Sequence, residues 1–254
     1  MAPDRWQVWI GDLRASKRIT AEARPLASDH LEGSIQATVR RFRRAFKLKP
    51  TVLRGDEIQA VLTPDAPALK ILTYLRAQLA TKGDVIQEIY AGMGFGTIPV
   101  MHARNPFESD GPAFHLARRA LDSLKDRKNA RARTVWVTEA PEFDEAAAAM
   151  LPLLDTFFSR WSREQWEAIV HRMHGATMHT IGEALGVATQ AAHKRLHAAR
   201  WREVAKAMAY LDSLQPGAPA RPVSAATGGV IARGSARERT TTRPRATRPS
   251  TSGG

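Results

Sequence analysis

The sequence predicts an α+β protein in which a domain of alternating strands and helices precedes an all-helical segment and a basic tail. Up to about residue 138, short apolar runs alternate with stretches of helical periodicity, as is typical of βα units in one layered domain. From about residue 150 to residue 214 only helical spacing remains. From Pro216 onward, Pro, Gly, Ser, Thr and Arg dominate, so we expect disorder. The predicted domains are therefore residues 1–140, 141–214 and 215–254.

The first predicted element is a strand at residues 6–10, which ends at Gly11-Asp12. A helix of about 20 residues is expected to follow, with Ser28 as its N-cap. The β-branched runs at 51–55 and 57–62 predict a hairpin.

The second half of the domain is predicted to continue with a helix after Pro67 and the longest strand at residues 85–98. A helix at 110–125 and a final strand at 132–138 complete the order β-α-β-β-α-β-α-β.

The composition excludes several classes of protein. The chain has 254 residues, of which 43% are hydrophobic and 25% charged, so it can bury a sizeable core. It has no cysteine, which excludes disulfides, cysteine nucleophiles and thiolate zinc sites. The first ten residues lack a signal-peptide core, and no apolar run approaches the roughly 20 residues of a membrane span. We therefore expect a soluble, cytoplasmic protein without membrane contact.

The charge predicts a polyanionic partner. Lysine and arginine number 38 against 25 acids, which gives a net charge of +13 and a pI near 10.8. Nucleic acid is the commonest partner of such a protein, although arginine-rich codon usage with a basic tail is an alternative explanation. After Pro216 seven arginines face one acid, so the tail contributes +6. It would either neutralise DNA phosphates or serve only solubility.

Two predicted strands end in an aspartate beside a glycine, at Asp12 and Asp56. If these strands are neighbours in the sheet, the two carboxylates converge on one edge. Paired carboxylates are what Mg²⁺ needs, with substrate phosphates completing its coordination. Gly-Asp is also an ordinary turn, so the pattern allows both interpretations.

Four motifs in this region resemble the SatD family. They are VWIGDLRASKRI, LRGDEIQAVL, AGMGFGTI and DGPAFHLARRALDSL, which occur in the family's order over about residues 6–137. That family resembles a branch of the nucleotide cyclase fold, which also contains class III adenylate cyclases and GGDEF diguanylate cyclases. The resemblance implies a ferredoxin-like βαββαβ sheet with helices on one face.

The resemblance also implies roles for residues. The cyclase metal ligands fall on Asp12, Asp56 and Glu57, which would hold Mg²⁺ or Mn²⁺. The helix motif G-x-x-x-N-x-x-x-R falls on Gly111, His115 and Arg119, and the latter two would be catalytic in a cyclase. The remaining nucleotide-binding positions are Leu13, Arg14, Ala15, Ser16, Lys17 and Gly55.

This chain departs from the cyclase pattern at two of these positions. His115 replaces the asparagine that orients the ribose, and Arg54-Gly55 replaces the first two glycines of the GGDEF loop. Class III cyclases share their sites between two subunits, so the resemblance implies a possible homodimer.

The helical segment resembles the helix-turn-helix of sigma-factor region 4. Residues 181–196 have its apolar spacing, with Gly186 at the turn between two helices. The second of these helices is predicted to run from residue 187 to 214. In that motif the second helix enters the major groove of double-stranded DNA. The expected DNA-binding residues are Thr189, Gln190, His193, Lys194, Arg195, Arg200 and Arg202.

These observations leave three hypotheses for function. In the first, a domain that binds a nucleotide and a metal regulates a DNA-binding helix-turn-helix. In the second, the protein is a cyclase that forms a cyclic nucleotide from a nucleoside triphosphate, and the helical segment caps the domain or forms a dimer. In the third, it is a structural adaptor without either activity.

Overall fold

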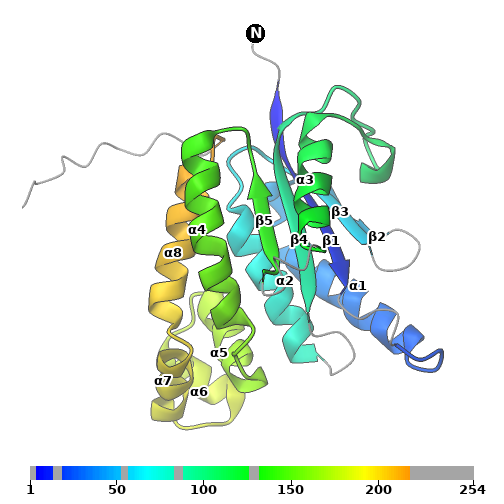
Figure 1. Ribbon diagram of the computed structural model, residues 1–254. Helices are drawn as coiled ribbons and strands as arrows, with labels where there is room; N and C mark the ends of the chain where they lie inside the picture. Colours follow the sequence, from blue (N-terminus) through cyan, green and yellow to red (C-terminus); the bar gives the residue numbers. More distant parts are fainter. Residues whose placement is uncertain (1–3, 14–18, 53–56, 83–87, 126–131, 218–254) are drawn as a thin grey trace, which may run out of the picture. The chain divides into compact units, whose positions relative to one another are not determined.

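The computed structural model describes residues 4–13, 19–52, 57–82, 88–125 and 132–217 (Figure 1). These residues form an α+β structure with one mixed sheet of five strands and eight α-helices, which confirms the predicted class. The strands are β1 (Arg5–Leu13), β2 (Phe46–Val52), β3 (Glu57–Leu62), β4 (Ile89–Thr97) and β5 (Thr134–Val137). The helices are α1 (Arg24–Arg41), α2 (Ala68–Lys82), α3 (Pro112–Ser123), α4 (Pro141–Phe158), α5 (Arg163–Met173), α6 (Met178–Leu185), α7 (Thr189–Ala198) and α8 (Trp201–Leu214).

The strands lie in the order β2-β3-β1-β4-β5. The pairs β2–β3, β3–β1 and β1–β4 are antiparallel, whereas β5 runs parallel to β4 after the α3 crossover. The order of elements predicted for the N-terminal region is thus present. β1 occupies the middle of the sheet, and its C-terminal end lies between the start of β3 and the start of β4.

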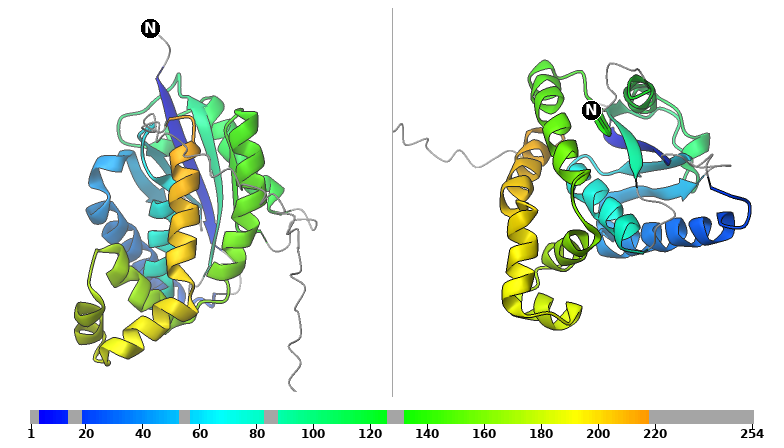
Figure 2. Two further views of the ribbon diagram at one scale, coloured as in Figure 1. Left: turned by 90° about the vertical axis from the view of Figure 1, so that its left-hand side faces the viewer. Right: turned by 60° about the horizontal axis from the view of Figure 1, so that its bottom comes forward.

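Two helical layers cover the two faces of this sheet (Figure 2). Alternate residues of β1 point to opposite faces, as the two-residue period of a strand requires. Val8 and Ile10 pack with α3, whereas Trp9 and Leu13 pack with α1 and α2. The charged end of β1 at Asp12 follows the phase of Val8 and Ile10 and therefore lies on the α3 face.

Close packing of α3 on the sheet depends on glycines in β4. A Cβ on Gly92 would overlap the backbone of Ala117, and one on Gly94 would overlap the backbone of Ala113 and Ala117. The absence of side chains lets the helix backbone approach the strand directly. This contact fixes the height and rotation of α3 relative to the end of β1.

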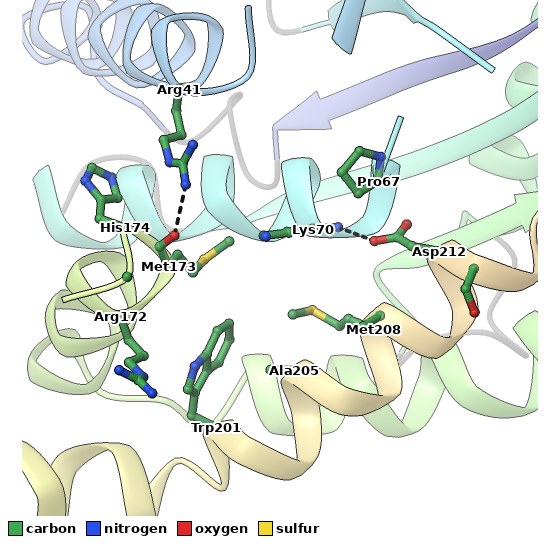
Figure 3. Close-up of a pocket in the computed structure, with 13 residues that line it drawn as sticks. Arg41, Pro67, Lys70, Arg172, Met173, His174, Trp201, Ala205, Met208 and Asp212 are labelled. Atoms are coloured by element: carbon green, nitrogen blue, oxygen red, sulfur yellow. Dashed lines mark hydrogen bonds between the residues drawn. The ribbon is translucent and has the colours of Figure 1, made fainter. Parts of the chain in front are cut away.

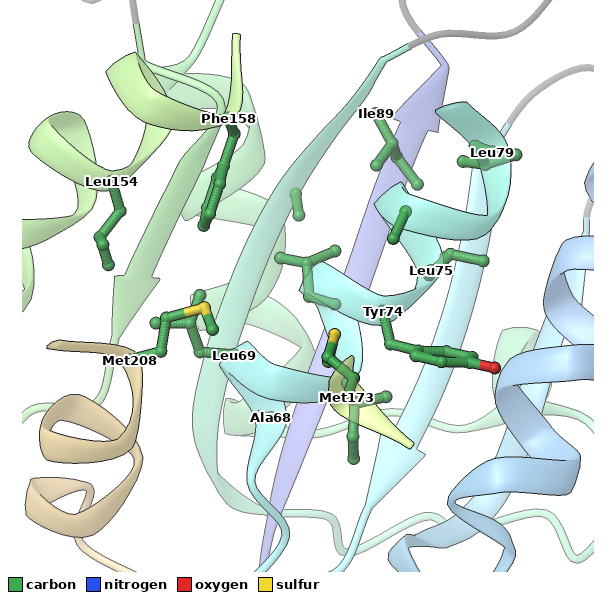
Figure 4. Close-up of a cluster of buried hydrophobic side chains, with 14 of the residues drawn as sticks. Ala68, Leu69, Tyr74, Leu75, Leu79, Ile89, Leu154, Phe158, Met173 and Met208 are labelled. Carbon is green, nitrogen blue, oxygen red and sulfur yellow. The ribbon is translucent and has the colours of Figure 1, made fainter. Parts of the chain in front are cut away.

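The helical segment shares its core with the sheet region. In Figure 4, α2 lies at the centre of a cluster to which α4 contributes Leu154 and Phe158, α5 contributes Met173 and α8 contributes Met208. A buried pair, Arg76 and Asp155, joins α2 to α4 with 3.4 Å between Nη1 and Oδ1. The segments predicted as two domains therefore meet along one continuous hydrophobic interior.

Asp155 is also an anchor for β5. Its Oδ2 accepts hydrogen bonds from the backbone N–H groups of Arg133 and Thr134, and its Oδ1 accepts one from the Thr134 hydroxyl. Burial raises the pKa of Asp155, an effect that the charge of Arg76 and these hydrogen bonds oppose. One carboxylate thus holds three elements together.

Three predicted boundaries need correction. The first helix begins at Arg24 and not at Ser28, because Pro25 in the first turn is favourable for a helix start. The first strand of the hairpin begins earlier, at Phe46. The predicted helix 187–214 is broken, because Arg200 has a left-handed backbone (φ 52°) and separates α7 from α8.

The break at Arg200 has a packing cause. The indole N–H of Trp161 donates to the carbonyl of Ala199 over 2.9 Å, which removes that carbonyl from the helical pattern. Trp201 then packs edge-to-face against Trp161, with 6.1 Å between ring centroids. A contact with a residue 38 positions away in sequence thus ends the helix.

Candidate functional site

Antiparallel pairing brings two acidic residues together at one edge of the sheet. Asp12, near the end of β1, lies directly opposite Glu57, the first residue of β3. Directly opposed residues point to the same face of an antiparallel sheet, so both carboxylates lie on the α3 side. The strand predicted to end at Asp56 is β2, and it is not a neighbour of β1, because β3 lies between them. The end of β1 pairs instead with the start of β3. Asp56, the other predicted ligand, lies outside the described residues.

Arg118 of α3 meets this acidic edge. Its Nη1 and Nη2 donate to Oε2 and Oε1 of Glu57 over 2.7 and 2.6 Å, which is a bidentate ion pair. The amide of Gln59 donates a third hydrogen bond to Glu57 over 2.8 Å. Glu57 was predicted as a metal ligand, but in this structure both of its oxygens bind a cation from the protein itself.

The electrostatics keep this pair ionised. Burial alone would raise the pKa of Glu57, but the hydrogen bonds from Arg118 and Gln59 outweigh it and lower that pKa. The hydrogen bond to Glu57 raises the pKa of Arg118, and the nearby carboxylates of Asp122 and Asp12 add to the rise. Arg118 therefore lies between three acids and carries a permanent positive charge at the end of β1.

The two predicted catalytic side chains lie on a different side of α3. His115 and Arg119 share one exposed side of the helix, as their spacing predicts, but that side faces away from the sheet. Nε2 of His115 lies 2.9 Å from Oδ1 of Asp110, and the His115 side chain is 71% exposed. Within this chain they do not approach the acidic edge.

The sequence contains a signal for Arg118 that the motif comparison missed. Arg118 follows Phe114 by four residues and precedes Leu121 by three, and both of these apolar residues are buried on the α3 face of the sheet. Residues at these spacings share one side of a helix. Arg118 thus lies at the edge of the buried side of α3, whereas Arg119 lies on the exposed side of the helix.

Of the remaining residues predicted to bind the nucleotide, the structure describes Leu13 and Gly111. The Leu13 side chain is buried in the core on the α1 and α2 face. Gly111 begins α3 with φ 156°, and a Cβ there would lie 2.6 Å from Cδ of Pro99. Residues 14–17 and Gly55 lie outside the described residues.

A metal was expected at this edge. Among the residues that the structure describes, no group of three or more histidine or acidic side chains is arranged to hold one. The oxygen chemistry of Asp12 fits a hard cation such as Mg²⁺. The neighbour that would complete a pair is Asp56, since Glu57 is engaged by Arg118.

The segment predicted to be a helix-turn-helix forms the two helices α6 and α7. Gly186 takes a left-handed conformation (φ 64°) at the end of α6, and the N–H of Val187 donates to the carbonyl of Gly182 over 2.9 Å. Ile181 and Leu196 are buried between the helices, as expected. In α7, Ala192 is buried, whereas Ala191 is partly exposed.

The predicted DNA-binding residues are mostly exposed. Arg195 is the exception, because it is only partly exposed and its Nη1 lies 3.7 Å from Oε2 of Glu167 on α5. The exposed set is Thr189, Gln190, His193, Lys194, Arg200 and Arg202.

Comparisons with solved structures find nucleotide cyclase domains. A bacterial light-regulated adenylyl cyclase is 11% identical over 52% of this chain and 75% of its own, with a TM-score of 0.40. The guanylate cyclase domain of RhGC from Catenaria anguillulae, in complex with GTP, is 17% identical over 47% of this chain and 73% of its own, with a TM-score of 0.37. The adenylyl cyclase CyaB from P. aeruginosa is 18% identical over 47% and 72%, with a TM-score of 0.33.

Three further findings concern membrane spans, curated proteins and the family of the chain. None of the helices in the described ranges combines the length and apolarity that a bilayer crossing needs. No curated protein matches the sequence. A family model does match it over residues 7–204, a span that includes α5, α6 and α7 as well as the sheet. Because this match covers well over half of the sequence, the chain belongs to the SatD family.

Proposed function

We propose that the edge formed by the end of β1 and the start of β3 binds a nucleoside triphosphate with a divalent cation and converts it to a cyclic nucleotide and pyrophosphate, by attack of a ribose hydroxyl on the α-phosphorus. The observation that carries the proposal is the pairing of Asp12 with Glu57 on the face where Arg118 lies. The order β2-β3-β1-β4, with α1 and α2 on one face, supports a ferredoxin-like sheet of the nucleotide cyclase type.

In this proposal Asp12 and Asp56 hold Mg²⁺ or Mn²⁺. The bound ion would neutralise the triphosphate and lower the pKa of the attacking ribose hydroxyl. Asp56 directly precedes Glu57, which is the residue opposite Asp12 in the register. The backbone of residues 13–17, which continues from β1, would cradle the phosphates.

Glu57 and Arg118 act on the phosphates through charge. The bidentate contact fixes the plane of the Arg118 guanidinium and leaves further N–H donors for an anion at the acidic edge. Arg118 would stabilise charge that develops on the phosphates, as preorganised donors do in phosphoryl transfer. Glu57 is then a positioning residue, and its contribution passes through Arg118.

His115 and Arg119 can contribute only if another surface covers the exposed side of α3. We therefore propose that a second copy of the chain supplies that surface, and that each site combines Asp12 of one copy with His115 and Arg119 of the other. The exposure of both side chains in the single chain supports such an arrangement.

The test is product formation from each nucleoside triphosphate with Mn²⁺, followed by chromatography. We expect Asp12→Asn and Arg119→Ala each to abolish the cyclic product, and an equal mixture of the two variants to regain part of the activity. A chain that carries both substitutions should not restore the cyclic product when it is mixed with either single variant. Asp65→Asn, an exposed carboxylate in the turn before α2, is the matched control. Absence of any cyclic product from the wild-type chain contradicts the proposal.

A second candidate function is DNA binding by α7. It is favoured by the exposed polar and basic residues of that helix, which begins directly after the left-handed turn of Gly186. Gln190 would contact adenine and Lys194 guanine, while Arg200 and Arg202 would contact phosphates. The nucleotide site would then regulate DNA binding.

DNA binding can be tested with the full chain over a series of salt concentrations. Replacing Arg200 and Arg202 by glutamine should lower the salt slope by about two, since each phosphate contact contributes about 0.9. Gln190→Ala should reduce the preference between sequences without changing the slope. A slope unchanged by the arginine substitutions would assign the DNA affinity to the basic tail and contradict this second candidate.

A further inference from the structure

A pocket lies on the opposite side of the sheet from the acidic edge, where α2, α5 and α8 meet (Figure 3). Its volume is about 650 Å³, which is within the range of pockets that hold small molecules. Trp201 and Met208 line it from α8, and Met173 lines it from the end of α5. The pocket therefore offers an apolar surface large enough for an aromatic or aliphatic group.

Three cations from three different helices surround this apolar surface. They are Arg41 from the last turn of α1, Lys70 from the first turn of α2 and Arg172 from the last turn of α5. One carboxylate, Asp212, also lines the pocket. Burial lowers the pKa of His174, so that residue adds no charge at pH 7. With Asp212 ionised, the lining keeps a net charge of +2.

Two of the three cations, Arg41 and Arg172, donate to backbone carbonyls at and just after the end of α5. Nη2 of Arg41 donates to the carbonyl of Met173 over 3.3 Å, and Nη1 of Arg172 donates to the carbonyl of Ala176 over 2.8 Å. Each bond uses one of the five N–H donors of a guanidinium. The two groups are therefore fixed at the pocket and retain donors for an anion.

The aromatic surface is also fixed. Trp201 packs edge-to-face on Trp161, whose indole N–H is bonded to Ala199. The sulfur of Met208 accepts a hydrogen bond from the Thr73 hydroxyl over 3.2 Å. Because the lining is set by these buried contacts, the pocket does not depend on a ligand for its shape.

From this combination we infer that the pocket binds a small organic anion, with its apolar part against Trp201 and Met208 and its carboxylate, sulfonate or phosphate group at Lys70 and Arg172. Its size excludes a nucleic acid duplex. The basic C-terminal tail is a poor occupant, because its charge of +6 has the same sign as the lining. The site is independent of the acidic edge, since α2 and α3 cover opposite faces of the sheet.

Two matched probes test this inference on the full chain: anilinonaphthalenesulfonate, which is an aromatic anion, and the uncharged phenylnaphthylamine. Fluorescence titration should give one saturable site, with the anion bound about tenfold more tightly than its neutral counterpart. This ratio corresponds to one charge-assisted interaction.

The variants separate the charge of the pocket from its shape. Lys70→Met and Arg172→Met should each weaken binding of the anion about five- to tenfold and change binding of the neutral probe less than twofold. Lys49→Met, which removes an exposed cation from β2, should change neither. Ala205→Trp, which fills the pocket without removing a charge, should abolish binding of both probes.

Thermal unfolding of each variant shows whether it is folded, and the two charge variants decide the result if Ala205→Trp is not. Equal affinity for the two probes, or an equal loss in Lys70→Met and Lys49→Met, overturns the inference. Binding of neither probe by the folded wild-type chain also overturns it. Asp12→Asn should leave binding of both probes unchanged, so that failure here is distinct from failure of the proposed nucleotide site.

Discussion

Two arginine–carboxylate pairs lie on opposite faces of the sheet and differ in their exposure to water. In the pair of Arg76 and Asp155, the side chains are 7% and 1% exposed, whereas in the pair of Arg118 and Glu57 they are 39% and 25% exposed. Burial lowers the pKa of Arg76 and raises that of Asp155. At the more exposed pair the pKa of Arg118 is raised and that of Glu57 is lowered.

The comparison shows that the same two chemical groups serve different purposes. A buried ion pair must offset the loss of hydration of both charges, so its partners are committed to each other and to the backbone. A half-exposed pair keeps its charges at little cost and can still meet a ligand. We therefore assign the Arg76 pair to structure and the Arg118 pair to the candidate nucleotide site.

The largest expected effect comes from breaking the buried pair. Asp155→Ala leaves Arg76 buried without its partner and removes the acceptor of two β5 amides, so it should lower the free energy of unfolding by about 3–5 kcal/mol. Urea denaturation followed by circular dichroism measures this. The double variant Arg76→Met with Asp155→Leu is the control, and it should regain part of the loss. A loss below about 1 kcal/mol would show that the pair is not structural.

A partly buried carboxylate without an arginine partner sharpens the comparison. Asp212 of α8 accepts hydrogen bonds from the N–H groups of Leu69 and Lys70 at the start of α2, and burial raises its pKa to about 7. Since its pKa in the unfolded chain is about 3.9, its contribution to stability is complete below pH 4 and is lost as the pH rises through 7.

The consequence is a pH-dependent stability that Asp212→Asn should remove. Between pH 4 and pH 7 the wild type should lose up to about 4 kcal/mol relative to this variant, which retains an acceptor for one backbone amide. Chemical denaturation at both pH values measures the difference. If the wild type and the variant change in parallel, Asp212 does not titrate in this range.

Breaking the half-exposed pair should have a small effect on stability. Glu57→Gln and Arg118→Met should each lower the free energy of unfolding by less than about 1 kcal/mol, because water solvates the remaining group. The same substitutions should weaken nucleotide binding at least tenfold, with Arg118→Lys intermediate. Calorimetric titration measures the binding. A loss of stability as large as that of Asp155→Ala would remove the distinction between the two pairs.

The smallest effect is expected at a more exposed pair at the C-terminal end of α3, between Asp122 in the last turn and Lys125 just after the helix. Nζ of Lys125 lies 3.1 Å from Oδ1 of Asp122, and both side chains are more than half exposed. Lys125→Met should change the free energy of unfolding by no more than about 0.5 kcal/mol. A larger loss in urea denaturation would mean that the exposure of an ion pair does not determine how much the pair contributes to the free energy of unfolding.

Local sequence signals predicted the elements but not all of their ends. At the start of α5, Ser162 and Gln165 form a capping box, a signal that is local because it involves residues only three positions apart. The end of α7 at Arg200 depends on Trp161, which is distant in sequence, so helical periodicity alone could not reveal it. The sequence predicted that the ends of the first two strands converge if these strands are neighbours, but β3 lies between β1 and β2, so the start of β3 meets Asp12. Glycine-bounded runs mark where a strand ends but not which strand lies beside it.

Site residues were harder to predict from the sequence where their role depends on which side of a helix faces the sheet. The motif spacing selected Arg119, whereas the packing of α3 on the β4 glycines turns Arg118 toward the sheet. The pocket combines residues from α1, α2, α5 and α8, which are distant in sequence, and has no sequence motif. Such sites become visible only when the helices are packed.

The measurement that tests the acidic edge most directly is binding of Mn²⁺ by electron paramagnetic resonance, with and without a nucleoside triphosphate. We predict that the wild-type chain immobilises Mn²⁺ together with the nucleotide, that Asp12→Asn loses this signal, and that Asp65→Asn retains it. Equal immobilisation of Mn²⁺ in the wild type and in Asp12→Asn would contradict the assignment of this edge as the nucleotide site.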